Sequence, residues 1–384
     1  MQDSLQPLLR LSLGRGERVP ILTAHSMPTR SRTLSLSTND LEFAALRTLS
    51  AALGRDPHRT QAAGGNTSLK RDGRLWVKAS GTWLAEAEER EIFLPVALEP
   101  LLAAVHANDE RAAKATDFVV AEANPLNLRP SVETSVHAVL PQAAVLHIHC
   151  VETVALAGRT DAEAEIAVRL DDLPGVIWSY VSYVKPGLPL AREIDAVSKP
   201  GTNVVVLGNH GLIVAAETVA EAGRLVEQVS AALASPVRAA PPADIEALGA
   251  LAEGSPYRLP EDPAAHATAT DPGRLAIARQ GTLYPDHVVF LGSGIAVLDD
   301  GDTPAALAER AALAPMLVAV PGKGVLIHKD VLRGGDALAR ALADVTGRIP
   351  ADAPLHFLTV EQEQELVTWD AEIYRRTLAS AAKS

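Results

Sequence analysis

Two closely spaced histidines have the residue type and spacing of a metal site. His147 and His149 are two positions apart in the apolar segment Ala143–His149. In a β-strand such residues point to the same face, with backbones about 6.6 Å apart, so both imidazoles can converge on one cation. Cys150 would lie on the opposite face with Ile148, so its position does not predict a ligand. Two half-buried histidines that bind nothing would produce the same pair.

His210 provides the third imidazole that such a site would need. It lies in the segment Leu207–Gly211, a tight turn between two apolar stretches. Glycine on each side of this turn lets the backbone reverse while the imidazole projects from the end of a sheet. Without partners, a histidine in a turn would simply face water. Together with the pair, it predicts a site for Zn²⁺ or another divalent metal that leaves one position open to substrate.

Glu133 is the candidate carboxylate for this site. It lies near the start of a helix predicted over 131–140, after Arg129 and Pro130. A carboxylate in a first turn is favoured by the helix dipole, so helix capping is the alternative to a chemical role. His137 follows on the same helical face, where the two residues could bind a second metal or form a surface contact. Three histidines and a carboxylate able to move protons are what a catalytic zinc requires.

Two loops of small residues could bind an anion. They are Gly64–Ser68 (GGNTS) and Ser80–Thr82 (SGT). Both offer unhindered backbone N–H groups and hydroxyls, which suit the oxygens of a phosphate. Lys70 and Lys78 are close by in the sequence and would add positive charge. Each loop taken alone is also a common turn that binds nothing.

Helical and strand patterns alternate through residues 39–235 and predict a layered α/β domain. Apolar residues recur at helical spacing from Leu41 to Leu53 and from Val219 to Val229, which indicates helices that each bury one face. Shorter helices are predicted over 97–107, 131–140 and 152–158. The predicted strands are apolar runs bounded by turn residues, at 75–79, 90–96, 143–149, 176–180, 202–207 and 211–215.

Residues 236–242 (PVRAAPP) predict a linker to a C-terminal part, 243–384. There, strands at 317–320 and 325–328 and a helix near 330–345 follow the same order as the elements at 203–232. Both a degenerate repeat and coincidence explain this order. Gly322–Gly324 lacks a nucleotide-binding fingerprint, and His287 and His328 have no spaced partner. We expect an α/β extension that serves packing or oligomerisation.

The composition limits the partners. The net charge of −12 argues against nucleic acid, which needs a broad basic surface. No apolar run is long enough to cross a membrane. The single cysteine, Cys150, fits a reducing compartment, so we expect a cytoplasmic protein. Residues 1–38 are rich in arginine, serine and threonine and are expected to be a disordered or mis-assigned N-terminal tail rather than a targeting peptide.

Five motifs in order resemble the class II aldolase/adducin family, most closely the rhamnulose-1-phosphate aldolase portion of bacterial aldolase/dehydrogenase proteins. The motifs are GGNTS at 64–68, KASGT at 78–82, RPSVETSVHAVLP at 129–141, HIH at 147–149 and NHG at 209–211. The resemblance covers 39–235, and extends weakly through 284–287 and 369–374. It implies a layered α/β fold with a central, mostly antiparallel sheet flanked by helices.

The resemblance also implies a site and a reaction. It implies zinc at the three histidines, Glu133 as the base that leaves the metal when substrate arrives, and a homo-oligomer. The implied phosphate-binding residues are Gly65, Asn66, Ser80, Gly81 and Ser131, although Val132 stands where fuculose-1-phosphate aldolase has a second serine.

The implied reaction is cleavage of a ketose-1-phosphate, a small phosphorylated sugar, to dihydroxyacetone phosphate and an aldehyde. Epimerases, dehydratases and decarboxylases of the family use the same chemistry. Their second acid, for which Tyr180 and Tyr183 are candidates, would distinguish them. An adducin-like interaction module without catalysis is the alternative from another class; the complete histidine set speaks against it.

Overall fold

The structure, a computed structural model, describes residues 38–368, and its first sheet carries the predicted site. The sheet has seven strands in the order β3-β2-β1-β4-β7-β6-β5, and only the β5–β6 pair is parallel. The predicted α/β fold with a mostly antiparallel sheet is therefore confirmed. The strands are β1 (Asn66–Arg71), β2 (Arg74–Lys78), β3 (Phe93–Ala97), β4 (Ala144–Ile148), β5 (Trp178–Val181), β6 (Val204–Leu207) and β7 (Gly211–Ala216).

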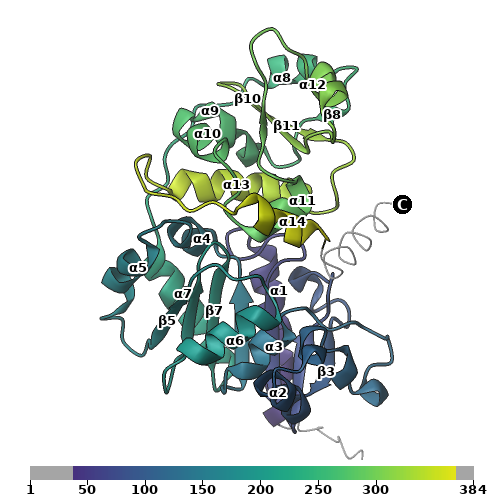
Figure 1. Cartoon of the computed structure of the whole chain (residues 1–384), viewed down its shortest axis with the longest axis vertical. Coiled ribbons are helices and arrows are strands. Elements are labelled where there is room, and N and C mark those ends of the chain that lie inside the picture. The colour runs from purple at the N-terminus through teal and green to yellow at the C-terminus, as the bar shows by residue number, and fades with distance from the viewer. Residues whose placement is uncertain (1–37, 369–384) are drawn as a thin grey trace, which may run out of the picture. The chain divides into compact units, whose positions relative to one another are not determined.

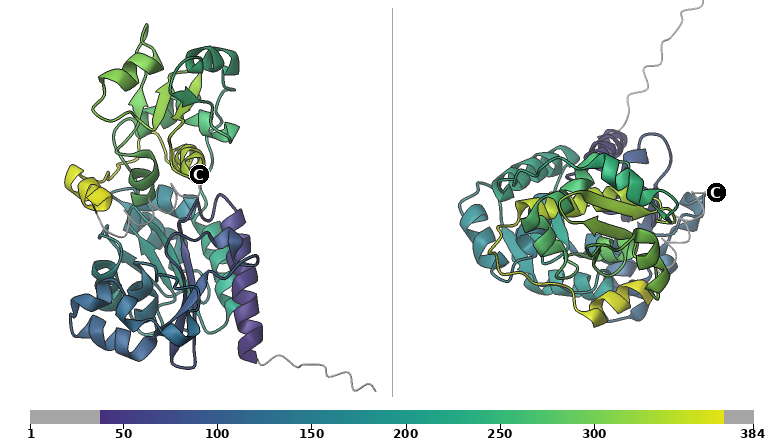
Figure 2. Two further views of the ribbon diagram at one scale, coloured as in Figure 1. Left: turned by 90° about the vertical axis from the view of Figure 1, so that its right-hand side faces the viewer. Right: turned by 90° about the horizontal axis from the view of Figure 1, so that it is seen from above.

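Helices cover both faces of this sheet because apolar side chains alternate along its strands. On β4, Leu146 and Ile148 pack in the cluster that includes Leu46 and Val226, whereas Val145 packs on the other face. Helices α1 (Thr38–Arg55) and α7 (Val219–Leu233) lie on the first face, and α2 (Leu98–His106), α3 (Thr134–Val139) and α6 (Leu188–Val197) on the second (Figures 1 and 2). Two further helices follow β4, namely α4 (Val151–Ala157) and α5 (Ala162–Leu170).

One sequence prediction about this sheet was wrong in part. The expected loop 64–68 already contains the start of β1 at Asn66. This strand is polar, and its buried hydroxyls are satisfied inside the protein: Thr67 Oγ1 lies 2.7 Å from Ser50 Oγ, and Ser68 Oγ lies 2.8 Å from His137 Nδ1. Hydrogen bonds replace the apolar contacts on which the hydrophobic pattern depends, so the pattern gave no signal.

A second sheet follows in the C-terminal part. Its four strands have the order β8-β11-β10-β9, with antiparallel, antiparallel and parallel pairing. The strands are β8 (Tyr257–Arg258), β9 (Ala296–Val297), β10 (Leu317–Val320) and β11 (Gly324–His328). The helices are α8 (Ile245–Ala252), α9 (Ala267–Thr270), α10 (Pro272–Ala278), α11 (Pro285–Leu291), α12 (Pro304–Arg310), α13 (Gly335–Arg348) and α14 (Val360–Thr368).

The second sheet has the topology of one half of the first. The pairings β4–β7, β7–β6 and β6–β5 are also antiparallel, antiparallel and parallel. In both sheets a three-residue turn joins the antiparallel pair, from Leu207 to Gly211 and from Val320 to Gly324. In this alignment Lys323 takes the place of His210. A common origin of the two halves stays a prediction.

The C-terminal part is packed against the first domain. Val151, Val154 and Ala155 of α4 belong to the apolar cluster formed by the C-terminal helices and strands. Arg348 pairs with Glu152 at 3.2 Å. The domain boundaries at 38/39, 235/236 and 242/243 stay predictions. Among the described residues, no helix is both long and apolar enough to cross a membrane.

Candidate metal centre

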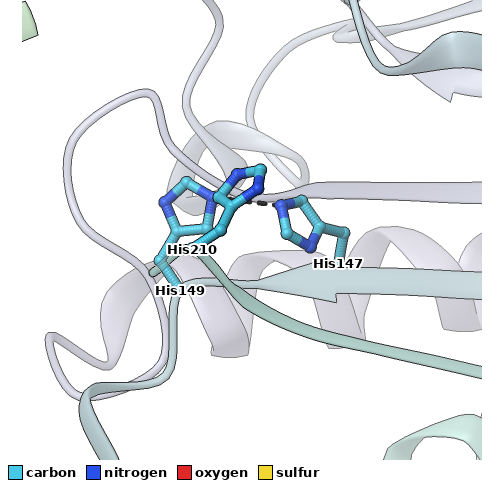
Figure 3. Close-up of side chains that lie close together, drawn as sticks. All are labelled: His147, His149 and His210. Atoms are coloured by element: carbon cyan, nitrogen blue, oxygen red, sulfur yellow. Dashed lines mark hydrogen bonds between the residues drawn. The ribbon is translucent and has the colours of Figure 1, made fainter. Parts of the chain in front are cut away.

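The three predicted histidines meet at one point (Figure 3). His147 lies on β4, His149 directly follows that strand, and His210 is the last residue of the β6–β7 turn. Their ring centroids are 4.9 to 5.1 Å apart, and they form a buried group whose ligand atoms all lie within 4.8 Å of one another. Gly211 permits this approach, since a Cβ there would lie 2.5 Å from the Ile148 carbonyl oxygen.

The partners of the outer ring nitrogens decide which atoms face the centre. His147 Nδ1 lies 3.2 Å from the Leu212 carbonyl oxygen, and His149 Nδ1 lies 2.7 Å from Asp286 Oδ2. A carbonyl and a carboxylate only accept, so each Nδ1 carries the proton and each Nε2 presents a lone pair. Burial lowers the pKa of His147, which Glu133 opposes; the imidazole is therefore neutral, as a metal ligand must be.

The spacing of these lone pairs fits a cation. The Nε2 atoms of His147 and His149 are 3.1 Å apart. Around a tetrahedral ion with bonds of about 2.05 Å, ligand nitrogens would be about 3.3 Å apart. Glu133 Oε1 lies 3.6 Å from His147 Nε2 and 3.5 Å from His210 Nε2. Without a cation, acceptor atoms would face one another at short range, so the donor set fits a divalent metal.

Glu133 is not used as a helix cap. It precedes α3, yet its side chain makes no capping hydrogen bond. Its carboxylate is buried, and Oε1 has no hydrogen-bond partner within the described part of the chain. Buried polar atoms without a partner are uncommon and costly, and they are often found at functional sites. Glu133 therefore does not cap the helix through a side-chain hydrogen bond, and its role in the chemistry of the site stays a prediction.

A pocket adjoins the centre and contains most of the predicted phosphate-binding residues. Gly65, Ser80, Gly81 and Ser131 line it together with Glu133, His149 and His210. The backbone N–H of Ser80 donates to the Arg129 carbonyl at 2.9 Å, which holds the two serine-containing segments side by side. Gly65 and Gly81 have φ angles of 66° and 74°, which glycine adopts without strain.

Asn66 and Lys78 complete the polar surroundings. Asn66 is fully buried, and neither Nδ2 nor Oδ1 has a hydrogen-bond partner among the described residues. Asn66 itself is not among the pocket's lining residues, whereas Lys78 is. Lys78 Nζ donates to the carbonyl oxygens of Ala63 at 3.1 Å and Thr82 at 2.8 Å. These bonds hold a cationic amine between the two loops, which suits an anionic ligand.

Other candidates lie elsewhere. His137 is fully buried and bonded to Ser68, so it neither forms the expected surface contact nor joins the histidine group. Tyr180 and Tyr183 line a different cavity, with Asn209 and His356. The extension through 369–374 lies outside the described residues.

Asp286 is the contact that the sequence analysis missed. It is separated from His149 by 137 residues and belongs to the C-terminal part, where packing or oligomerisation was expected and the family resemblance extended only weakly, through 284–287. Pro285 at the first position of α11 and Asp286 in its first turn are typical of any helix start. That signal could have indicated the helix, but not its partner.

Solved structures and a curated protein are similar to part of this chain. The N-terminal class II aldolase domain of a conserved Thermoplasma acidophilum protein is 26% identical, with a TM-score of 0.44, over 54% of this chain and 98% of that one. The L-fuculose-1-phosphate aldolase of Thermus thermophilus is 20% identical, with a TM-score of 0.32, over 50% and 90%. An uncharacterized oxidoreductase, YuxG of Bacillus subtilis, is 30% identical over 180 residues, 43% of this chain. The chain spans a quarter of that protein's length.

A family model gives the assignment. The model of the class II aldolase and adducin N-terminal domain matches residues 46–235, the range that contains the three histidines, Glu133 and both small-residue loops. Residues 46–235 of this chain belong to the class II aldolase and adducin family.

Proposed function

We propose that this chain is a metal-dependent lyase that cleaves a ketose-1-phosphate to dihydroxyacetone phosphate and an aldehyde. One observation carries the proposal: three imidazoles and the Glu133 carboxylate converge beside a pocket lined by Lys78 and Ser80. The family of residues 46–235 supports it. The metal would be Zn²⁺, held by His147, His149 and His210, because neutral imidazoles with a carboxylate are typical zinc ligands.

The pocket would hold the phosphate. Backbone N–H groups at Gly65 and Gly81, the hydroxyls of Ser80 and Ser131, and the amine of Lys78 would bind its oxygens. Asn66 is also a predicted phosphate ligand, although its buried amide does not line the pocket. Binding of this remote group would fix the carbon chain of the sugar against the metal centre, so that binding energy is used for orientation.

Cleavage requires charge stabilisation and proton movement. When bound, the cation would act as a Lewis acid on the carbonyl and neighbouring hydroxyl oxygens of the sugar. The hydroxyl on the far side of the bond would lose its proton as its carbon becomes the aldehyde carbonyl, and the electron pair of the broken carbon–carbon bond would stay on the carbon next to the ketone carbonyl. Glu133 would give that carbon a proton, and in the synthetic direction would remove it. Both steps would take place in this pocket.

The proposal also includes the cellular location and the oligomeric state. We place the enzyme in the cytoplasm as a homo-oligomer. Epimerisation, dehydration and decarboxylation would start from the same stabilised carbanion, so the products formed distinguish these reactions from aldol cleavage.

The test is product formation by metal-loaded protein. Purified full-length chain with one equivalent of Zn²⁺ would be incubated with ketose-1-phosphates, and dihydroxyacetone phosphate would be measured by coupled oxidation of NADH. We expect turnover that is lost on metal chelation and reduced at least about 100-fold by His149→Ala, since a catalytic zinc needs its full ligand set. Zinc content would be measured in parallel.

Two outcomes would reject parts of the proposal. If the wild-type chain binds zinc but releases no dihydroxyacetone phosphate from any ketose-1-phosphate, the reaction is wrong and the metal site stands. If wild type and His149→Ala both contain negligible zinc after incubation with the metal, the enzymatic function is wrong, and a non-catalytic interaction module is favoured.

A further inference from the structure

A side chain from outside residues 46–235 contacts the metal centre. Asp286, in the first turn of α11, lies 2.7 Å from His149 through Oδ2 and Nδ1. Both side chains are buried. Residues 46–235 match the family model, so this carboxylate comes from the C-terminal part. It also lines the pocket beside the centre, together with Pro285 and Leu366.

The contact selects one of two forms of His149. A neutral imidazole carries its proton on either Nδ1 or Nε2. Because a carboxylate accepts and cannot donate, the 2.7 Å contact with Asp286 keeps the proton on Nδ1. Nε2 is then the atom with a free lone pair, and it faces His147 Nε2 at 3.1 Å. With the proton on Nε2, His149 could not bind a cation at this point.

Gly64 leaves room for this pair. A Cβ at this position would lie 2.5 Å from Asp286 Oδ2 and 2.9 Å from His149 Nδ1. Any side chain there would push against both partners of the hydrogen bond. A glycine at the first position of the GGNTS motif therefore allows the contact with the C-terminal part, in addition to any contact that it makes with a ligand.

We propose that Asp286 is a positioning residue of the metal centre: it holds His149 in the tautomer and orientation that bind the cation, so the C-terminal part completes the site. This inference rests on the proposed metal site. A hydrogen-bonded carboxylate also makes an imidazole a stronger ligand, and loss of such a partner typically weakens metal binding about 10- to 100-fold.

The experiment measures Zn²⁺ affinity of the full-length chain by competition with a chromophoric chelator. Asp286→Asn and Asp286→Ala should raise the dissociation constant about 10- to 100-fold. The asparagine amide can rotate and donate to Nδ1, so it no longer enforces the tautomer. Asp344→Asn is the matched control. Asp344 is a carboxylate of the C-terminal part that pairs with Arg340 and His58 and touches no proposed ligand, so zinc affinity should stay at the wild-type value.

A second variant reaches the same contact without changing either partner. Gly64→Ala should separate Asp286 from His149 and weaken zinc binding by a similar factor. Gly249→Ala, at a position with open space around its Cβ, is its control and should bind like wild type. These variants keep the test informative if the Asp286 variants fail to fold.

The possible results distinguish failure of the proposed function from failure of the role proposed for Asp286. Wild type that binds no zinc would reject the proposed function, and with it the basis of this inference. Wild type that binds zinc, with dissociation constants within twofold for the folded Asp286 variants, would reject only the role of Asp286. If the Asp286 variants do not fold, a dissociation constant within twofold of wild type for Gly64→Ala would reject that role instead.

Discussion

At the scale of single residues, the centre depends on the atoms behind the ligands as much as on the ligands. The Leu212 carbonyl and the Asp286 carboxylate each fix the proton on the outer nitrogen of one imidazole. The inner nitrogens can then act only as acceptors. Residue types predicted the ligands, but the choice of nitrogen follows from contacts that are far apart in the sequence.

His287 provides a pH test of stability next to Asp286. Its ring is fully buried, Nε2 lies 3.0 Å from the Gly294 carbonyl, and burial lowers its pKa. The unfolded chain therefore binds a proton on this side chain more readily than the native state does, so stability falls as the pH drops below about 6.5. Between pH 7.5 and 5.5, metal-free wild type should therefore lose more unfolding free energy than His287→Gln.

Urea denaturation at the two pH values, followed by circular dichroism, measures this difference. Glutamine keeps a donor for the Gly294 carbonyl and has no proton to gain, so the comparison cancels the titration of all other groups. An identical pH dependence in the two proteins would contradict the assignment of this acid sensitivity to His287.

At the scale of elements, the β6–β7 turn is tied to the C-terminal part by one side chain. Asn209 Nδ2 donates to the carbonyl oxygens of Leu283 at 2.9 Å and His356 at 2.8 Å, and His356 Nδ1 lies 2.9 Å from Asn209 Oδ1. Asn209 has a φ of 54°, which asparagine tolerates better than most residues. The C-terminal part therefore holds the turn that carries His210, and it also contacts His149.

Asn209→Gly should separate the role of the side chain from that of the backbone. Glycine adopts the positive φ without strain, so the loss would come from three hydrogen bonds, one buried and two part-buried, at about 2–4 kcal/mol of unfolding free energy. Asp72→Gly, in the exposed turn between β1 and β2 with a φ of 51°, should change stability by less than about 0.5 kcal/mol. Equal effects of the two substitutions in urea denaturation would contradict this account.

The sequence predicted elements whose cause is local. Apolar periodicity indicated α1 and α7, and apolar runs bounded by turn residues indicated β4, β6, β7, β10 and β11. The polar strand β1 was missed because its buried groups pair with other side chains. His137 was misjudged because the helix that carries it is buried. Nothing near Asp286 in the sequence specifies a partner 137 residues away, since such a contact depends on how the C-terminal part packs against the first domain.

At the scale of the whole molecule, the same strand topology occurs once with a histidine and once with a lysine in the turn. Strands β4 to β7 of the sheet that bears the histidines and the four strands of the C-terminal sheet share strand order and orientation, yet Lys323 stands in the turn position of His210. The second sheet therefore lacks the turn ligand, and the helix α11, between β8 and β9, carries Asp286 to the centre. For the C-terminal part, we therefore propose a role in the metal site in addition to the predicted packing role.

Separating the two parts tests their dependence. A fragment of residues 38–235 would expose the buried α4 residues Val151, Val154 and Ala155 and lose Asp286 and the partners of Asn209. We expect the fragment to self-associate, because a new apolar face is exposed to water, and to bind Zn²⁺ at least about 10-fold more weakly than the full chain. Sedimentation velocity and chelator competition measure the two effects. Co-expression with residues 236–384 as a separate chain should restore both properties, whereas a monodisperse fragment with full zinc affinity would mean that the site is complete without the C-terminal part.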